Sequence, residues 1–153
     1  MEYKTIIYAE QGRQDLTIKR TFELPLELLF KAYVDPEVVE QWMGTKVVKL
    51  ESKNHGSWQF ETKDASGKIV FQANGVIHEF CPNNKITRTF EMVNSNLPVQ
   101  LEFMEFKELD VHTSELTIHI IYRSAADRDK MIQFGFEAGL NMAHNRLQHH
   151  YTN

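Results

Sequence analysis

The sequence has a single cysteine, Cys81, so it can form neither an internal disulfide nor a thiolate metal cluster. It has 17 Lys and Arg against 21 Asp and Glu, a formal net charge of −4, and its basic residues form no stripe. Because nucleic-acid binding needs clustered positive charge, we expect no nucleic-acid partner. No apolar run approaches the ~20 residues of a membrane span, so we expect no membrane insertion.

The first residues lack the basic segment and apolar run that mark a secretory signal peptide. With the single cysteine, this favours a reducing compartment, and we expect a cytoplasmic protein. No repeat, low-complexity tract or linker-like stretch divides the chain, so its 153 residues predict one domain, 1–153. The 10 Phe, 5 Tyr, 2 Trp and 6 Met supply large apolar surface that suits either a core or an apolar pocket.

Alternating apolar and polar residues predict an antiparallel sheet. The clearest strands are residues 16–22 and 115–122, and residues 46–122 form a series of strands separated by turns at 64–67 and 82–84. Short connections between strands with alternating faces favour antiparallel pairing. Residues 69–80 fit neither face cleanly, which predicts a bulge near Gly75.

Two short helices are predicted between residue 25 and Gly44, because Pro25 and Pro36 suit first helical turns and Asp35 is a good N-cap. A long helix is predicted at about 125–150, opened by a capping box at 124–127. Helical spacing predicts one stripe facing water: Gln133, Glu137, Asn141, His144 and Gln148. The opposite stripe is expected to face the sheet: Met131, Gly135, Ala138, Gly139 and Met142.

Gly135 and Gly139 are one turn apart on that predicted inner stripe. Each glycine costs about 1 kcal/mol against alanine inside a helix, so the pair needs a reason. Tight packing of the helix on the sheet and a vacancy for a ligand explain it equally well.

Short motifs along most of the chain have a familiar order. They are Arg20-x-Phe22-x-x-Pro25, Leu29-Phe30-x-Ala32-Tyr33-x-Asp35-Pro36-Glu37, Gln41-Trp42-x-Gly44, Gly56-Ser57-Trp58-x-Phe60, Asp64-x-x-Gly67, residues 75–82 and residues 135–140. This order resembles the activator-of-heat-shock-protein-90-ATPase-like branch of the START (SRPBCC) superfamily. The resemblance implies an α+β helix-grip fold, in which a curved antiparallel sheet, two short helices and a long C-terminal helix enclose an apolar cavity.

Two positions depart from the family pattern. The family usually has two glycines before the position of Trp58, where this chain has Asn54-His55-Gly56. Met43 follows Trp42, where a second aromatic residue is common. Both could reshape the mouth of a cavity. The functions in the family are diverse, so the resemblance informs the fold more than the function.

The sequence contains no recognisable catalytic motif. It has no Gly-x-Ser-x-Gly elbow or phosphate-binding glycine loop, and its seven histidines show no helical zinc-site spacing. We therefore predict no cofactor, no metal site and no catalytic residue. His78 is the histidine expected nearest a pocket, but no acid–base partner for it can be identified.

Several arginines occupy positions that need an explanation. Arg20 and Arg88 alternate with core-type residues, so each either orients an acidic or carbonyl ligand or pairs with a carboxylate such as Glu79, Glu102 or Glu105. Arg128 and Arg146 lie near the ends of the last helix and are expected to reach solvent.

Ligand binding is the favoured function: a carrier or sensor that takes an apolar or amphipathic small molecule between the sheet and the C-terminal helix. The expected ligand-binding residues are Trp42, Trp58, Phe60, Phe71, His78, Arg88, Phe90, Phe103, Met131, Gly135 and Met142. Two alternatives stay open. One is an enzyme of the polyketide cyclase or hydratase type that uses Arg88 and His78. The other is an interaction module that binds a protein partner or forms a homodimer through exposed apolar residues such as Met43 or Leu97.

Overall fold

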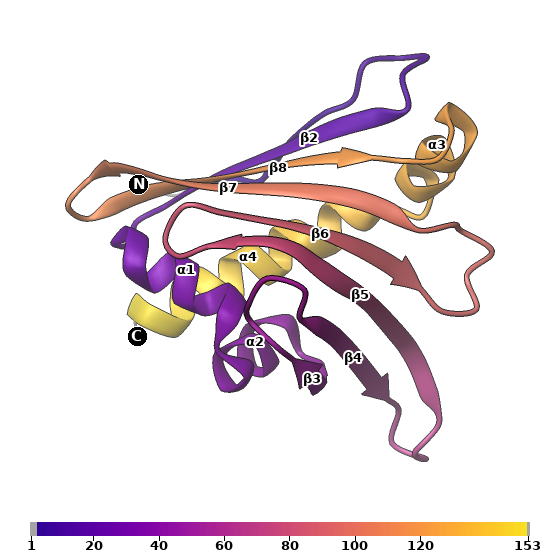
Figure 1. The fold of residues 1–153 in the computed structure, drawn as a ribbon, viewed down its shortest axis with the longest axis horizontal. Helices are drawn as coiled ribbons and strands as arrows, with labels where there is room; N and C mark the ends of the chain where they lie inside the picture. The colour runs from indigo at the N-terminus through magenta and orange to yellow at the C-terminus, as the bar shows by residue number, and fades with distance from the viewer. Residues whose placement is uncertain (1–2, 153) are drawn as a thin grey trace.

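The computed structural model describes residues 3–152, which form one curved antiparallel sheet covered on one face by helices (Figure 1). The elements in chain order are β1 (Ile6–Tyr8), β2 (Asp15–Phe22), α1 (Leu26–Val34), α2 (Pro36–Met43), β3 (Lys46–Leu50), β4 (Ser57–Lys63), β5 (Ile69–Cys81), β6 (Lys85–Met92), β7 (Gln100–Asp110), β8 (Thr113–Ile121), α3 (Ala125–Gln133) and α4 (Phe136–Thr152). The predicted α+β helix-grip fold is confirmed.

The eight strands follow the order β1-β2-β8-β7-β6-β5-β4-β3. Figure 1 shows α4 running behind the sheet, from the α3 end toward α1 and α2. We call the sheet face that packs against these helices the inner face. Residues of even number in β2, in β8 and in β7 as far as Phe106 point to it and are buried, as in Leu16, Ile18, Met104, Leu116 and Ile118.

The two short helices form as predicted. The Asp35 side chain accepts a hydrogen bond from the backbone N–H of Glu37, and Gly44 ends α2 in the left-handed conformation. The Trp42 indole donates to the carbonyl of Ala32 at 2.7 Å, which locks α2 against α1. Trp42 therefore belongs to the packing between helices.

The predicted bulge lies just beyond Gly75, where the register between β5 and β6 shifts between Ile77 and Glu79. Gly75 itself is required by close packing, because a Cβ there would overlap the carbonyl oxygen of Thr89 and crowd the indole of Trp58. The glycine thus allows strand β6 and the Trp58 ring to approach the backbone of β5.

The single C-terminal helix that the sequence predicts is instead two helices. Phe134 ends α3, and Gly135, at φ +72°, turns the chain before α4 begins at Phe136. The left-handed turn at Gly135 interrupts the helical path, so residues after it no longer keep the spacing of 3.6 residues per turn with those before it. The predicted stripes are therefore wrong for α4: His144 is fully buried, whereas Met142 is 60% exposed.

The inner side of α4 is formed by a stripe with ordinary helical spacing: Phe136, Leu140, Ala143, His144, Leu147 and Tyr151. Gly139 faces open space, so neither glycine of the predicted pair lies against the sheet. The tight-packing explanation of that pair is therefore wrong. Within residues 3–152, no helix is long and apolar enough to cross a membrane.

Candidate functional site

A buried ion pair lies in the middle of the inner face. Arg88 of β6 and Glu102 of β7 are cross-strand partners, and 2.9 Å separates Arg88 Nε from Glu102 Oε1. Their side chains are 14% and 8% exposed. Gln100 donates from Nε2 to the other carboxylate oxygen of Glu102 at 2.8 Å. Of the two explanations for Arg88, the structure shows the pairing with a carboxylate.

Trp58 forms the floor beneath this pair. The guanidinium carbon of Arg88 lies 4.8 Å from the centre of the Trp58 ring, close enough for a cation–π interaction. Phe60 and Phe90 pack on the same indole, with ring centroids 4.8 and 5.6 Å away. The ion pair is thus set in an aromatic surface that limits its contact with water.

The hydroxyl of Tyr122 is a second polar group on this face. It is buried, and no group within residues 3–152 is placed to hydrogen-bond with it. The register of β7 and β8 sets Tyr122 opposite Gln100, because the neighbouring Leu101 pairs with Ile121. Burial, helped by the negative charge of Glu102, raises the pKa of Tyr122, so its hydroxyl stays neutral. It can therefore donate or accept a hydrogen bond.

We call Arg88, Gln100, Glu102 and Tyr122 the polar row. It crosses β6 and β7 to the residue that follows β8, and its inward neighbours on these strands are mainly apolar. The carboxylate of Glu102 already accepts from Arg88 and Gln100. The Tyr122 hydroxyl is the polar group of the row whose hydrogen bonds the described residues leave open.

An open apolar depression of about 350 Å³ lies at one end of this face. Phe71 and Met92 line it from the sheet, and Met131, Phe134 and Phe136 line it from the junction of α3 and α4. Met92 is the next inward residue after Phe90 along β6, so the depression begins one pleat beyond the aromatic floor. Its volume is at the lower end of the ~300–1,000 Å³ of small-molecule sites.

A separate buried polar cluster joins β2 to α4. His144 Nδ1 lies 2.6 Å from the Thr5 hydroxyl, and its Nε2 lies 3.4 Å from the Tyr33 hydroxyl. Arg20 donates to the side-chain oxygens of Asn141 and Asn145 at 3.2 and 2.9 Å. Burial, and to a lesser degree the charge of Arg20, lowers the pKa of His144 to about 3. The described contacts of this cluster bind elements of the fold together.

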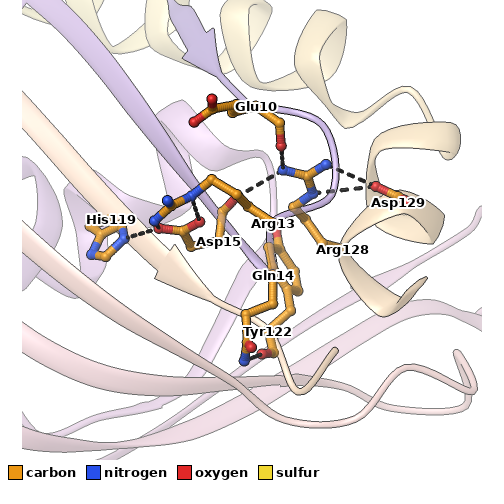
Figure 2. A network of polar contacts seen from close by, with 8 residues as sticks. All are labelled: Glu10, Arg13, Gln14, Asp15, His119, Tyr122, Arg128 and Asp129. Atoms are coloured by element: carbon orange, nitrogen blue, oxygen red, sulfur yellow. Dashed lines mark hydrogen bonds and ion pairs between the residues drawn. The ribbon is translucent and has the colours of Figure 1, made fainter. Parts of the chain in front are cut away.

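Arg128 connects α3 to the segment before β2 (Figure 2). Its Nη1 donates to the carbonyls of Glu10 and Asp15 at 2.6 and 3.1 Å, and Nη2 pairs with Asp129 at 3.0 Å. It is 3% exposed, so the expectation that it reaches solvent is wrong. The sequence correctly predicted a position near a helix end, but the chain between β1 and β2 covers that end and keeps the side chain from solvent.

Asp15 is the other centre in Figure 2, where Arg13 and His119 approach its carboxylate at 2.7 and 2.9 Å. Their hydrogen bonds hold its pKa well below the usual range. Arg146 is exposed, and it donates from Nε to the carbonyl of Trp42 at 2.9 Å. Both arginines near the ends of the C-terminal helical segment therefore fasten it to the rest of the fold.

The structure brings only part of the expected ligand-binding set together. Trp58, Phe60, Arg88 and Phe90 share the inner face, and Phe71 and Met131 line the apolar depression. The rest lie elsewhere: Trp42 between helices, Phe103 stacked on His119 on the outer face, His78 exposed beside His55, Gly135 at the helix break and Met142 in solvent.

Sequence reasoning did not single out Gln100, Tyr122, Met92 or Phe136. A signal existed in β7, where the usual pattern is inverted: Gln100 and Glu102 point inward, and Leu101 and Phe103 point outward. Polar side chains at inward positions of a strand need partners, which marks the strand as unusual. Among residues 3–152, no three His, Cys, Asp or Glu side chains come together in a way that could hold a metal ion.

Solved structures share this architecture at low sequence identity. Protein Ms6760 from Mycobacterium smegmatis aligns with a TM-score of 0.86 and 19% identity, over 97% of this chain and 96% of that one. A protein from Rhodobacter sphaeroides aligns at 0.83 and 16%, over 95% of both chains. DynU16, a protein in the dynemicin biosynthetic locus, aligns at 0.70 and 13%, over 92% of this chain and 48% of its own. Among curated proteins, none is similar enough in sequence to count as a relative.

The class that this architecture and these neighbours define is the α+β helix-grip fold. The model of one family in that class, the Activator of Hsp90 ATPase homolog 1-like proteins, matches residues 23–151. The chain belongs to this family.

Proposed function

We propose that this single domain binds an apolar or amphipathic small molecule between the sheet and the C-terminal helices. The apolar part would occupy the depression formed by Phe71, Met92, Met131 and Phe136, and the polar end would reach the polar row. The observation that carries the proposal is the buried Tyr122 hydroxyl, which no described residue satisfies. A carrier or sensor acting in the cytoplasm is the role that fits it.

The chemistry of the polar row selects the polar end of the ligand. A buried hydroxyl without a partner costs about 1–3 kcal/mol, and a ligand atom that bonds with it would recover this cost. In the rest of the row Arg88 is a donor only, and both oxygens of Glu102 already accept, from Arg88 and from the amide nitrogen of Gln100. A hydrogen-bond acceptor such as a carbonyl or carboxylate group therefore suits the row better than a donor such as an ammonium group.

The test compares ligands of equal chain length and different head groups. Decanoate, 1-decanol and decylamine are titrated into the protein, and the melting temperature and heat of binding are measured. We expect decanoate to bind most tightly and decylamine least. Native mass spectrometry of the freshly purified protein adds a survey of whatever small molecule it carries.

Two variants locate the site. Tyr122→Phe removes only the hydroxyl, so it should weaken decanoate binding about tenfold, while the free protein, relieved of an unpartnered buried hydroxyl, should become more stable. Tyr8→Phe, at an exposed tyrosine of β1, is the matched control and should bind as the wild type does. Met131→Trp should fill the depression and reduce binding of all three probes. Bare protein in the mass spectrum together with no response to any probe would refute the proposal.

An enzymatic role remains the second candidate, because a protein of the dynemicin biosynthetic locus has the same fold. The cyclase or hydratase alternative relies on Arg88 and His78 acting together. Arg88 is engaged with Glu102 inside the sheet, whereas His78 is exposed with its ring 5.6 Å from that of His55. Any such chemistry would have to use Tyr122 or the Arg88–Glu102 pair instead.

The interaction-module alternative also needs a different surface from the one first expected. Leu97 is buried and Met43 is half-buried, so neither forms an exposed apolar rim. Self-association is better argued from an edge of the sheet.

A further inference from the structure

The two edges of the sheet are protected to different degrees. β3, at one edge, carries Lys46 and Lys49 and a register shift between Val47 and Lys49, which are devices that discourage pairing with another strand. β1, at the other edge, consists of Ile6, Ile7 and Tyr8 and pairs only with β2 within the described chain. It has no charge and no bulge within its three residues. β1 is therefore the edge that remains available for another strand.

The direction of the free backbone groups follows from the register. The Tyr122 N–H donates to the carbonyl of Gln14, so even-numbered residues of β2 hydrogen-bond with β8 and odd-numbered ones with β1. Ile6 and Tyr8 pair with Lys19 and Thr17, so their backbone groups bond with β2. The N–H and C=O of Ile7 consequently point away from the sheet.

A groove of about 580 Å³ lies along this free edge. Thr5, Ile7 and Ala9 line it from β1 and its flanks, and Ile132 and Phe136 line it from α3 and α4. These are the positions of β1 whose backbone groups face outward, and the Thr5 N–H uses this direction to donate to Asn141. The groove thus offers both unpaired backbone groups and an apolar floor.

The sequence around Ile7 is complementary to itself when read in the antiparallel sense. Centring two copies on Ile7 pairs Ile7 with Ile7, Ile6 with Tyr8, Thr5 with Ala9 and Lys4 with Glu10. Lys4 and Glu10 are both exposed, so the pairing brings opposite charges together at each end. Ile6 and Tyr8, 49% and 53% exposed in the single chain, would cover each other on the outer face.

We propose that β1 is a homodimerisation edge, which joins two copies of this chain in antiparallel register about Ile7 into one continuous sheet. Ile7 of each copy exchanges backbone hydrogen bonds with Ile7 of the other, and Ala9 N–H donates to the Thr5 carbonyl of the second copy. The inward side chains of each β1 then face the groove floor of Ile132 and Phe136 of the other copy. This inference does not depend on the proposed ligand site.

The test exchanges the charges at the two ends of the paired strands. Sedimentation velocity at low to high micromolar protein concentrations measures the fraction of dimer. Lys4→Glu and Glu10→Lys each place like charges opposite one another at both ends, and each should weaken dimerisation about tenfold or more. The double variant K4E/E10K restores opposite charges and should dimerise as the wild type does. Lys4 and Glu10 are exposed in the single chain, so the substitutions should not disturb the fold. Thermal melting verifies that each variant folds.

Ile7→Pro tests the backbone pairing separately. Its N–H points away from β2, so proline removes an outward donor and spares the bonds between β1 and β2. We expect this variant to be monomeric. A monomeric wild type at the highest concentration would overturn the proposal, and so would a dimer that the single charge variants leave unchanged. A dimer that the single variants weaken and the double variant does not restore would refute this register.

Discussion

Arg88 and Glu102 face one another across β6 and β7 inside the sheet, with Arg88 Nε 2.9 Å from Glu102 Oε1 and the Trp58 ring beneath the guanidinium group. The carboxylate also accepts from Gln100. Two charges buried together satisfy each other, but either one alone would be left in an apolar setting. The pair therefore serves the fold while it holds the polar row in place.

Removing one partner of this pair should be costly. Glu102→Ala leaves the Arg88 charge buried without its carboxylate, and we expect the free energy of unfolding to fall by about 3 kcal/mol. Urea denaturation followed by circular dichroism measures the change. The control is Glu79→Ala, because Glu79 pairs with Lys85 at 3.2 Å where both side chains are well exposed. Similar losses for the two variants would contradict this account.

His144 should make the protein less stable as the solution is acidified from neutral pH. Its pKa is about 3 when folded and 6.5 as an ordinary histidine, so the unfolded chain binds a proton that the folded chain refuses. Stability then rises with pH and is lost progressively as the pH falls from 6.5 toward 3. At pH 5 the loss relative to neutral pH should be about 2 kcal/mol.

Chemical denaturation between pH 5 and 7 measures this slope without interference from the acidic groups. Five carboxyl groups have pKa values lowered from 3.8 or 4.5 in the folded protein, and the stability they contribute is lost only at lower pH. They are Asp15, Glu51, Asp64, Glu79 and Asp110. His144→Gln should flatten the profile in the upper window. If the slope of the unfolding free energy against pH were unchanged in this variant, a group other than His144 would be responsible for it.

Arg128 should control how firmly the chain between β1 and β2 is held. Arg128→Met removes donors to the carbonyls of Glu10 and Asp15, and we expect a loss of about 2 kcal/mol in stability. Hydrogen exchange at residues 9–14 should become faster. Arg123→Met, at an exposed arginine just before α3, is the control and should leave the exchange of this segment unchanged. Equal exchange in both variants would argue against the connection.

Most of the fold could be predicted because its signals are local. The strands follow from alternation, and α1 and α2 follow from Asp35, the two prolines and Gly44. Part of the candidate site could be predicted from the sequence in the same way, because Trp58, Phe60, Arg88 and Phe90 lie at alternating positions of their strands. Such positions share a face whatever the rest of the chain does.

The remainder depended on information that periodicity does not carry. In the first four residues of β7 the inward side chains are polar and the outward ones apolar. The apolar character of Phe103 therefore suggested an inward position, whereas its place in the strand turns it outward. For α4 the break at Gly135 shifted the phase, and the apolar spacing of Leu140, Leu147 and Tyr151 was the better guide. A helical stripe can be assigned only after each break in the helix has been located.

The two glycines of the C-terminal segment give a direct test of that break. Gly135 has φ +72°, a conformation that costs an L-residue about 1 kcal/mol, so Gly135→Ala should destabilise the protein by about this amount. Gly139 lies inside α4 with nothing within 4 Å of an added Cβ, so Gly139→Ala should stabilise it by about 1 kcal/mol. Thermal and urea unfolding of the two variants measure both changes. If α3 and α4 instead formed one continuous helix, both substitutions would raise stability, because alanine is the better helix former at each position. Opposite signs from the same chemical change, four residues apart, are the result that the broken helix requires.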